Sequence, residues 1–333
     1  MTAAAFPLAW HHFDEASKRH DEIASRWSRV LATEPVEERT LIEPDGCGSV
    51  SAVFVWPRGE RSALTATFRA LVTELWAALD SLIQESFESL SVLNRPRDST
   101  SLRFFPVADS QDTFESFLEQ SCLDGILTRQ FHMVRDVQPF VPDSGDARID
   151  ALRSAIRHLL AWETALEAGE TVSAWATPVS PQVNAEPPAE VTDLVPSPPG
   201  ELLGRRVLAE FRVNNYGPDM AVSSMSGTYV DVCFVPGFEP RDMEDTFDGR
   251  LKNVIFSLKL FALAFASFAD QLEGSRRVRL GDRTSESRWA DASKSVRQWS
   301  AQDLVPRLPQ NGSAHEWTPS AASIAKVGAA GVI

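Results

Sequence analysis

Seven of the chain's 21 prolines lie between residues 178 and 199, and this density strongly constrains how the chain can fold. Because proline has a fixed φ angle and no backbone N–H, the segment 178–200 is expected to be extended or irregular rather than helical. We therefore predict a Pro-rich connection over 178–200, with a domain boundary at that place.

The residues before this connection, 1–177, are predicted to be mainly helical. From about Arg61 to Leu93 the apolar residues recur at three- and four-residue steps, which places them on one face of a long helix. Further helices are predicted over 8–31, 112–122, 123–137 and 147–168, with Gly169 as the stop of the last one. An Asp-Gly pair between two β-rich runs predicts a β-hairpin at about 38–56.

The residues after the connection, 201–273, are predicted to form a small antiparallel sheet and a closing helix. Alternating or β-branched residues favour strands over 206–213, 221–225 and 229–235. The segment 246–272 is predicted to be an apolar helix; it falls short of the ~20 apolar residues of a membrane span and contains Lys259. The expected fold class is α+β, with an N-terminal mainly helical bundle and its hairpin followed by this sheet and helix.

Charge is divided unevenly along the chain. In total, 46 acidic and 32 basic residues give a net charge of -14, so no DNA partner is expected. Between Ser275 and Arg307, eight basic and four acidic residues give +4, which leaves -18 elsewhere. We predict a mobile basic and aromatic tail over 274–333, which is either a solvated tail with incidental contacts or a partner-binding segment. The candidate partner-binding residues are Arg276, Arg277, Arg279, Trp289, Trp299 and Trp317.

No sequence motif points to a cofactor or a metal, so neither is expected. The chain has no G-x-S-x-G elbow, G-K-[ST] phosphate loop or H-E-x-x-H helix. His12 and Glu15 have a spacing that could hold a cation, but no second set of ligands accompanies them. Three widely separated cysteines and an N-terminal segment without secretory features predict a cytoplasmic location.

The strongest catalytic candidate is the pair Arg153 and His158 on a predicted helix. Arg153 could hold a phosphate while His158 acts as general acid or base. The pattern resembles the R-x4-6-H motif of HEPN-type ribonucleases, α-helical proteins that usually act as dimers, and this resemblance implies metal-independent cleavage of RNA. In the other interpretation Arg153 and Arg157 are exposed and pair with Asp150 and nearby acids, while His158 packs one turn before Trp162.

A second resemblance covers about 10–270. The order of elements resembles a family of uncharacterised proteins that is common in GC-rich Gram-positive bacteria. The family patterns L-H-N-L-R-S-A-L-D-H-L, Q-F-P-I, L-Q-P-Y and L-N-N-I-D-K-H-R correspond here to 72–82, 104–107, 137–140 and 152–159. The apolar landmarks are kept, whereas the polar ones are replaced except for Asp80 and His158. The resemblance therefore implies a shared fold more than a shared chemistry.

These features favour a non-enzymatic binding or assembly protein over an enzyme. Its partner would be another protein or a second copy of the chain, contacted through the tail. The alternative is a HEPN-like ribonuclease that uses Arg153 and His158, and RNA is expected as a partner only in that case. A weaker alternative places the Phe-rich helix 246–272 against a membrane surface.

Overall fold

A computed structural model describes residues 6–90, 104–120, 126, 128–217, 219–225, 227–234 and 246–269. Over these residues the chain is α+β, as the sequence predicts. They divide into two compact units. Unit 1 holds 6–20, 69–164 and 251–269, and unit 2 holds 21–68 and 165–250 with the gaps stated above.

The helices agree closely with the apolar periodicity. They are α1 (Pro7–Leu31), α2 (Glu60–Leu90), α3 (Gln111–Gln120), α4 (Thr128–Asp136), α5 (Ala147–Glu167) and α6 (Phe247–Ala269). Gly169 has a φ of 87° and its N–H donates to the Leu166 carbonyl at 3.1 Å, which confirms it as the stop of α5. The ends predicted for α2 and α6 beyond residues 90 and 269 lie outside the described residues.

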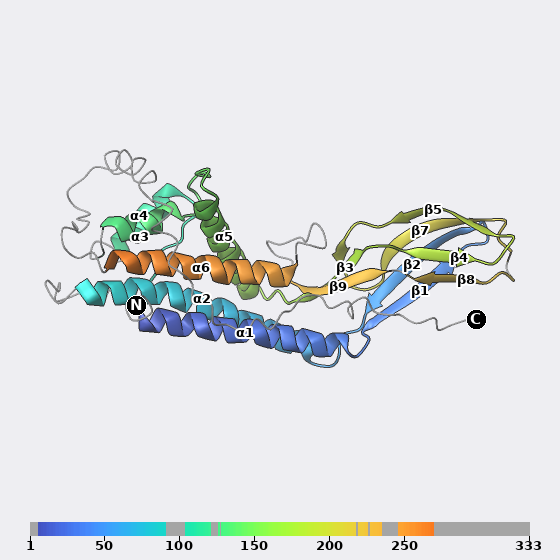
Figure 1. The fold of residues 1–333 in the computed structure, drawn as a ribbon, viewed down its shortest axis with the longest axis horizontal. Helices are drawn as coiled ribbons and strands as arrows, with labels where there is room; N and C mark the ends of the chain where they lie inside the picture. Colours follow the sequence, from blue (N-terminus) through green and yellow to red (C-terminus); the bar gives the residue numbers. More distant parts are fainter. Residues whose placement is uncertain are drawn as a thin grey trace. The chain divides into compact units, whose positions relative to one another are not determined.

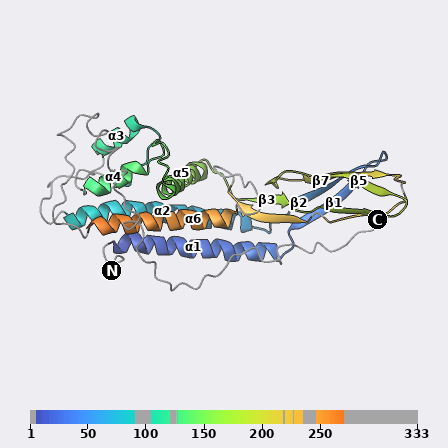
Figure 2. The same ribbon diagram turned by 45° about the horizontal axis from the view of Figure 1, so that its top comes forward.

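In unit 1 the helices α1, α2 and α6 lie side by side in both Figure 1 and Figure 2. The ring of Phe6, immediately before α1, lies 6.1 Å from that of Phe265 on α6. The buried amide of Gln130 on α4 joins two of these helices, because its Oε1 accepts from the Ser86 hydroxyl at 2.7 Å and its Nε2 donates to the Phe265 carbonyl at 3.2 Å. Helices on several sides explain why α6 is apolar nearly all round.

Unit 2 contains the strands, all paired antiparallel. They are β1 (Val36–Ile42), β2 (Cys47–Phe54), β3 (Ser173–Pro178), β4 (Gln182–Ala185), β5 (Glu190–Pro196), β6 (Gly200–Glu201), β7 (Arg206–Asn214), β8 (Val222–Met225) and β9 (Thr228–Cys233). Within the described residues they form a four-stranded sheet in the order β1-β2-β7-β5, a three-stranded sheet β6-β3-β9 and the pair β4-β8.

The predicted hairpin is confirmed, and the glycine of its turn is required. β1 and β2 pair in register from Val36 opposite Phe54 to Ile42 opposite Gly48. Gly46 has a φ of 85°, and a Cβ there would clash with the Val213 carbonyl oxygen. Only glycine combines that backbone conformation with so close an approach to another strand.

The prediction that 178–200 is not helical is confirmed, but its interpretation as a connection at a domain boundary is wrong. This segment contains β4 and β5 and reaches the start of β6, and these strands pair with β8, β7 and β3. Pro178 and Pro196 stand at the ends of β3 and β5, and Pro187 and Pro188 lie between β4 and β5. At strand ends and on an edge strand a missing N–H leaves the ladder intact, so a high proline density is compatible with a sheet.

The predicted grouping of strands also changes. The sequence predicts the hairpin as a part of the helical region, but β2 pairs with β7, for example Ser49 opposite Glu210, and both strands belong to unit 2. The three strands predicted for one sheet fall into three sheets, as β7, β8 and β9. A single division of the chain at 178–200 is therefore replaced by two units that each combine separated segments.

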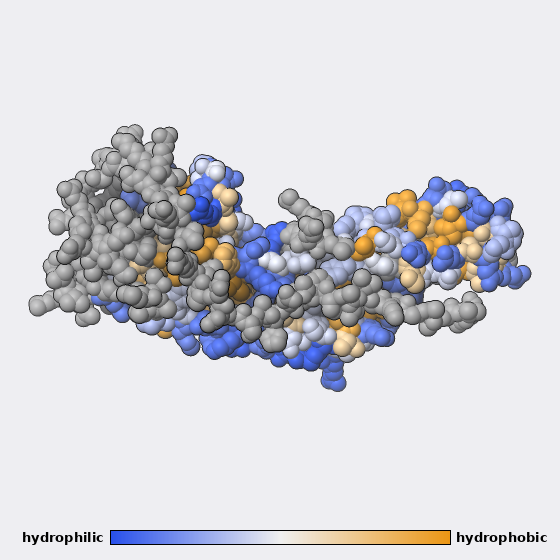
Figure 3. Space-filling view, in the orientation of Figure 1, coloured by the Kyte–Doolittle hydropathy of each residue, from blue (hydrophilic) through white to orange (hydrophobic). Residues whose placement is uncertain are grey.

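The edges of the four-stranded sheet are protected against further pairing. β5 carries a register shift between Thr192 and Val195 and ends at Pro196, while β1 carries charges at 37–39. Both features discourage the addition of another strand. Figure 3 shows apolar surface over the strands of unit 2, where Leu41 and Val195 are among the exposed apolar side chains.

No helix in the described ranges is long and apolar enough to cross a membrane. The predicted tail, 274–333, lies outside the described residues. The candidate binding residues Arg276, Arg277, Arg279, Trp289, Trp299 and Trp317 therefore have no structural placement here.

Candidate functional site

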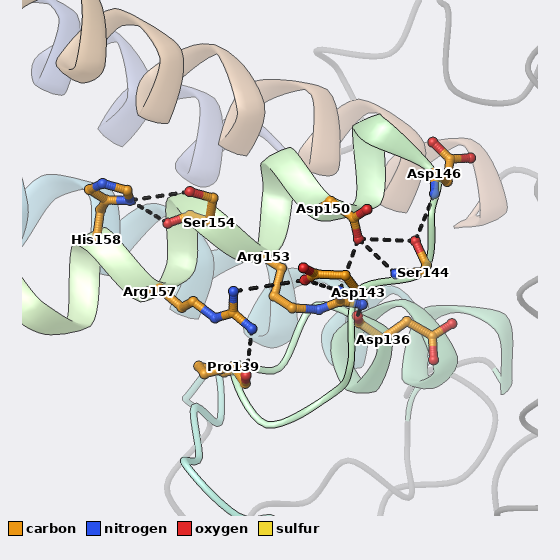
Figure 4. Close-up of polar contacts among 10 residues, drawn as sticks. All are labelled: Asp136, Pro139, Asp143, Ser144, Asp146, Asp150, Arg153, Ser154, Arg157 and His158. Carbon is orange, nitrogen blue, oxygen red and sulfur yellow. Dashed lines mark hydrogen bonds and ion pairs between the residues drawn. The ribbon is translucent and has the colours of Figure 1, made fainter. Parts of the chain in front are cut away.

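The polar site predicted on α5 lies where the preceding loop turns into the helix (Figure 4). The Asp146 carboxylate accepts the Arg148 N–H at 2.9 Å, which caps the first turn of α5. Asp150 Oδ1 accepts both the backbone N–H and the hydroxyl of Ser144, at 2.9 and 3.1 Å. The Ser144 N–H lowers the pKa of Asp150, so this carboxyl stays ionised and holds the loop onto the helix.

Arg153 is buried beneath this loop, with 1% of its surface exposed. Its guanidinium donates to Asp150 at 3.0 Å and to the backbone carbonyl of Asp136 at 2.9 Å, and it lies 3.4 Å from Asp143. Figure 4 shows these partners around Arg153, and they come from α5 itself, from the end of α4 and from the segment between the two helices. The guanidinium thus joins α5 to the end of α4.

A second buried charge pair lies beside Arg153. The Arg135 Nε donates to Asp136 Oδ1 at 3.0 Å, and both residues are buried at the end of α4. Burial raises the pKa of Asp136, whereas Arg135 and Arg153 oppose that rise. Two buried atoms of this cluster, Asp136 Oδ2 and Arg153 Nε, have no hydrogen-bond partner within the described part of the chain. In such a cluster the removal of any one charge is destabilising, because it leaves another buried charge without its partner.

His158 is engaged with its own helix. Its Nδ1 lies 2.6 Å from the Ser154 carbonyl oxygen, and because a carbonyl only accepts, Nδ1 carries a proton. The imidazole also packs against the Trp162 ring at 5.7 Å between centroids. Arg157, one residue before His158, donates to the Pro139 carbonyl at 2.9 Å.

The structure does not bring Arg153 and His158 together in one polar site. Five residues along a helix rotate a side chain by about 140°, and Figure 4 shows the two leaving α5 in different directions. The predicted contacts of Arg153 with Asp150 and of His158 with Trp162 are present. The expectation that Arg153 is exposed is wrong, because its side chain is buried and bonds to Asp150 on α5 and to the carbonyl of Asp136 at the end of α4.

Other polar candidates also have structural partners. His12 Nδ1 lies 2.7 Å from Glu74 Oε2, so this histidine pairs with α2 rather than with Glu15. Asp80 accepts the Phe105 N–H at 2.7 Å, and its burial raises its pKa. Among the described residues no three His, Cys, Asp or Glu side chains are placed to hold a metal ion together.

Comparisons with protein-family models, with curated proteins and with solved structures find no match to this chain. The resemblances to HEPN-type ribonucleases and to the family of GC-rich Gram-positive bacteria therefore stay predictions.

Arg135, Asp136 and Asp143 also belong to the cluster, although no sequence motif marks them. The available signal was an adjacent pair of opposite charges, Arg135 and Asp136, between the apolar residues Val134 and Val137. Charges placed inside an apolar pattern are unfavourable unless they are paired in the fold. This signal identifies a structural cluster more readily than a catalytic one.

Proposed function

We propose that this chain is a non-enzymatic binding or assembly protein. Its partner would be another protein or a second copy of the chain, contacted through the basic and aromatic tail, 274–333. The observation that carries the proposal is the division of charge, with +4 over 275–307 against -18 in the rest of the chain. A cytoplasmic location, where the cysteines stay reduced, is part of the proposal.

The described surface of unit 1 supports this proposal by its charge. Asp109, Asp112 and Asp143 are exposed around α3 and the start of α5, and 73% of the Asp143 side chain is accessible to solvent. The ring of Phe114 lies 5.9 Å from that of Phe140, so α3 packs against the segment that leads to Asp143. A surface with such carboxylates attracts an arginine-rich segment of a second copy or an equally basic region of another protein.

The polar residues on α5 favour binding over catalysis. Arg153, the residue required to hold a phosphate, is buried and bonded to the protein's own carboxylates and carbonyl. His158 donates to a backbone carbonyl and packs on Trp162. Both side chains therefore have a structural role that accounts for their position.

Tryptophans in the segment 275–317 are expected to anchor the contact. In the full-length chain we expect the substitutions Trp289→Ala, Trp299→Ala and Trp317→Ala together to weaken capture of a specific partner at least about tenfold, since buried tryptophans dominate many interfaces. The measurement is quantitative capture from the native cytoplasm by the immobilised chain, with the chain itself counted among possible partners. The control is Phe256→Ala, which removes a 47% exposed aromatic ring from α6.

Two results would contradict the proposal. One is an identical set of captured proteins for the wild type and the triple variant. The other is metal-independent cleavage of RNA by the purified chain that His158→Ala abolishes, because this would establish the HEPN-like alternative in place of a binding role.

A further inference from the structure

A buried carboxyl in unit 2 connects a strand to the start of the last helix. Asp231 lies within β9 and is 6% exposed. Its carboxyl accepts the N–H of Val232 at 2.8 Å, and it also accepts hydrogen bonds from the Tyr229 hydroxyl and from the N–H of Phe247. Because Phe247 is the first residue of α6, this one side chain joins β9 to the first turn of the helix.

The helix also brings a second acid toward this carboxyl. Asp248, the second residue of α6, is 5% exposed and acts electrostatically on both Asp231 and Tyr229. The first turn of α6 is capped by Thr246, whose hydroxyl accepts the Gly249 N–H at 3.0 Å. Asp231 and Asp248 thus interact electrostatically where α6 begins.

The neighbouring strands and helix complete the electrostatic surroundings. In β3, Trp175 lies opposite Asp231, and this strand contains no ionisable side chain. Glu201 of β6 lies opposite Trp175 and therefore in the same cross-strand row, one strand further away. From α2, the Arg61 Nε donates to the Val172 carbonyl at 2.8 Å, immediately before β3 begins.

Burial and the Asp248 charge raise the pKa of Asp231 to about 7, although the hydrogen bonds from Val232, Tyr229 and Phe247 act in the opposite direction. Burial also raises the pKa of Tyr229, which keeps its hydroxyl protonated as a donor. Since the pKa of Asp231 is higher in the fold than in an open chain, the junction is most stable at low pH. It loses stability as the pH rises from about 4 to about 7.

We propose that Asp231 is a pH-sensitive latch between β9 and the first turn of α6. When its carboxyl is protonated, the first turn is held onto the strand. When the carboxyl is ionised, it is a buried charge that faces Asp248, and the first turn opens more often.

Amide hydrogen exchange of the full-length chain at pH 6 and pH 8, corrected for the intrinsic exchange rate, tests the latch. In the wild type we expect protection of the amides at the start of α6 to fall about tenfold between these pH values, as one ionisation near pH 7 requires. In Asp231→Asn, which keeps the size of the side chain and removes its charge, the fall should disappear. The matched control is Asp219→Asn, an exposed aspartate of unit 2, which should behave like the wild type.

Three outcomes would overturn the latch: equal protection of the wild type at both pH values, an undiminished fall in Asp231→Asn, or a fall of the same size throughout β2 and β7. If Asp231→Asn does not fold, a carbon-13 NMR titration of the Asp231 carboxyl in the wild type tests the latch instead. A titration midpoint near 7 supports the latch. A midpoint below about 5, within the ordinary range of aspartate pKa values, contradicts it.

Discussion

Replacement of Arg153 by methionine is expected to lower the free energy of unfolding by about 3 kcal/mol or more. Methionine keeps much of the length of the side chain but removes all of its donors and its charge. The Asp136 carbonyl and the Asp150 carboxylate then lose a hydrogen bond, and Asp136 loses one of the two cations that oppose its raised pKa. Urea unfolding followed by circular dichroism measures the loss.

Arg157→Met is the matched control for this prediction. Arg157 lies one turn further along α5, its side chain is 47% exposed, and it also bonds to a carbonyl of the preceding segment. We expect a loss of no more than about 1 kcal/mol, because solvent replaces the contacts of an exposed arginine. Equal losses of unfolding free energy at the two positions would show that the burial of Arg153 does not increase its contribution to stability.

Phe68→Ala is expected to cost about 3 to 5 kcal/mol of unfolding free energy in unit 2. Phe68 on α2 is fully buried, and its ring lies 4.8 Å from that of Phe234 and 5.4 Å from that of Phe247. It therefore packs α2 against both the end of β9 and the start of α6. Alanine would leave a cavity where these three segments meet.

Differential scanning calorimetry and urea unfolding measure this effect. Phe256→Ala, at the 47% exposed position on α6, is the control and should change the unfolding free energy by less than about 1 kcal/mol. A loss of unfolding free energy below about 1 kcal/mol for Phe68→Ala would contradict the prediction that the Phe68 ring contacts stabilise the core of unit 2.

Local signals in the sequence predicted the elements well. Apolar residues at three- and four-residue steps gave α2 almost to its observed start at Glu60, and the Asp-Gly pair gave the β1–β2 hairpin. Both signals involve residues that are close together in the chain, so they can be recognised in a single sequence. Gly169 belongs to the same class, because a left-handed residue after a helix is a local requirement.

Pairings between distant segments were not predictable in the same way. The alternation in β7 indicates a strand but does not indicate that its partners are β2 and β5, which lie far apart in the chain. The seven prolines suggested a connection because their lost donors are costly inside a sheet, whereas the fold places Pro178 and Pro196 at strand ends. The partner of a strand is decided by packing of the whole unit.

In the polar site, too, contacts within one helix were predictable and contacts between separate segments were not. Sequence spacing identified the Arg153–Asp150 pair, which lies within one turn of helix. It did not identify the contact with Asp136, because that contact depends on how the loop before α5 folds back. Asp231 likewise lies in a segment that the sequence predicts only as a strand, although an acid among apolar strand residues indicates a buried polar group.

The binding role is tested most directly by reversing the charge of the segment 275–307 in the full-length chain. The test variant carries Arg276→Glu, Arg277→Glu and Arg279→Glu. The control carries the same substitutions at the exposed arginines Arg39, Arg58 and Arg205, so the net charge changes equally. Capture of partners, including the chain itself, is quantified for both at about 0.1 M and about 1 M salt.

We expect the wild type and the control to retain the same partner at the lower salt concentration and to lose much of it at the higher one. The test variant should fail to retain it at either concentration, because attraction between the segment and a carboxylate surface becomes repulsion. Equal retention by the test variant and the control at the lower salt concentration would contradict a binding role for this segment.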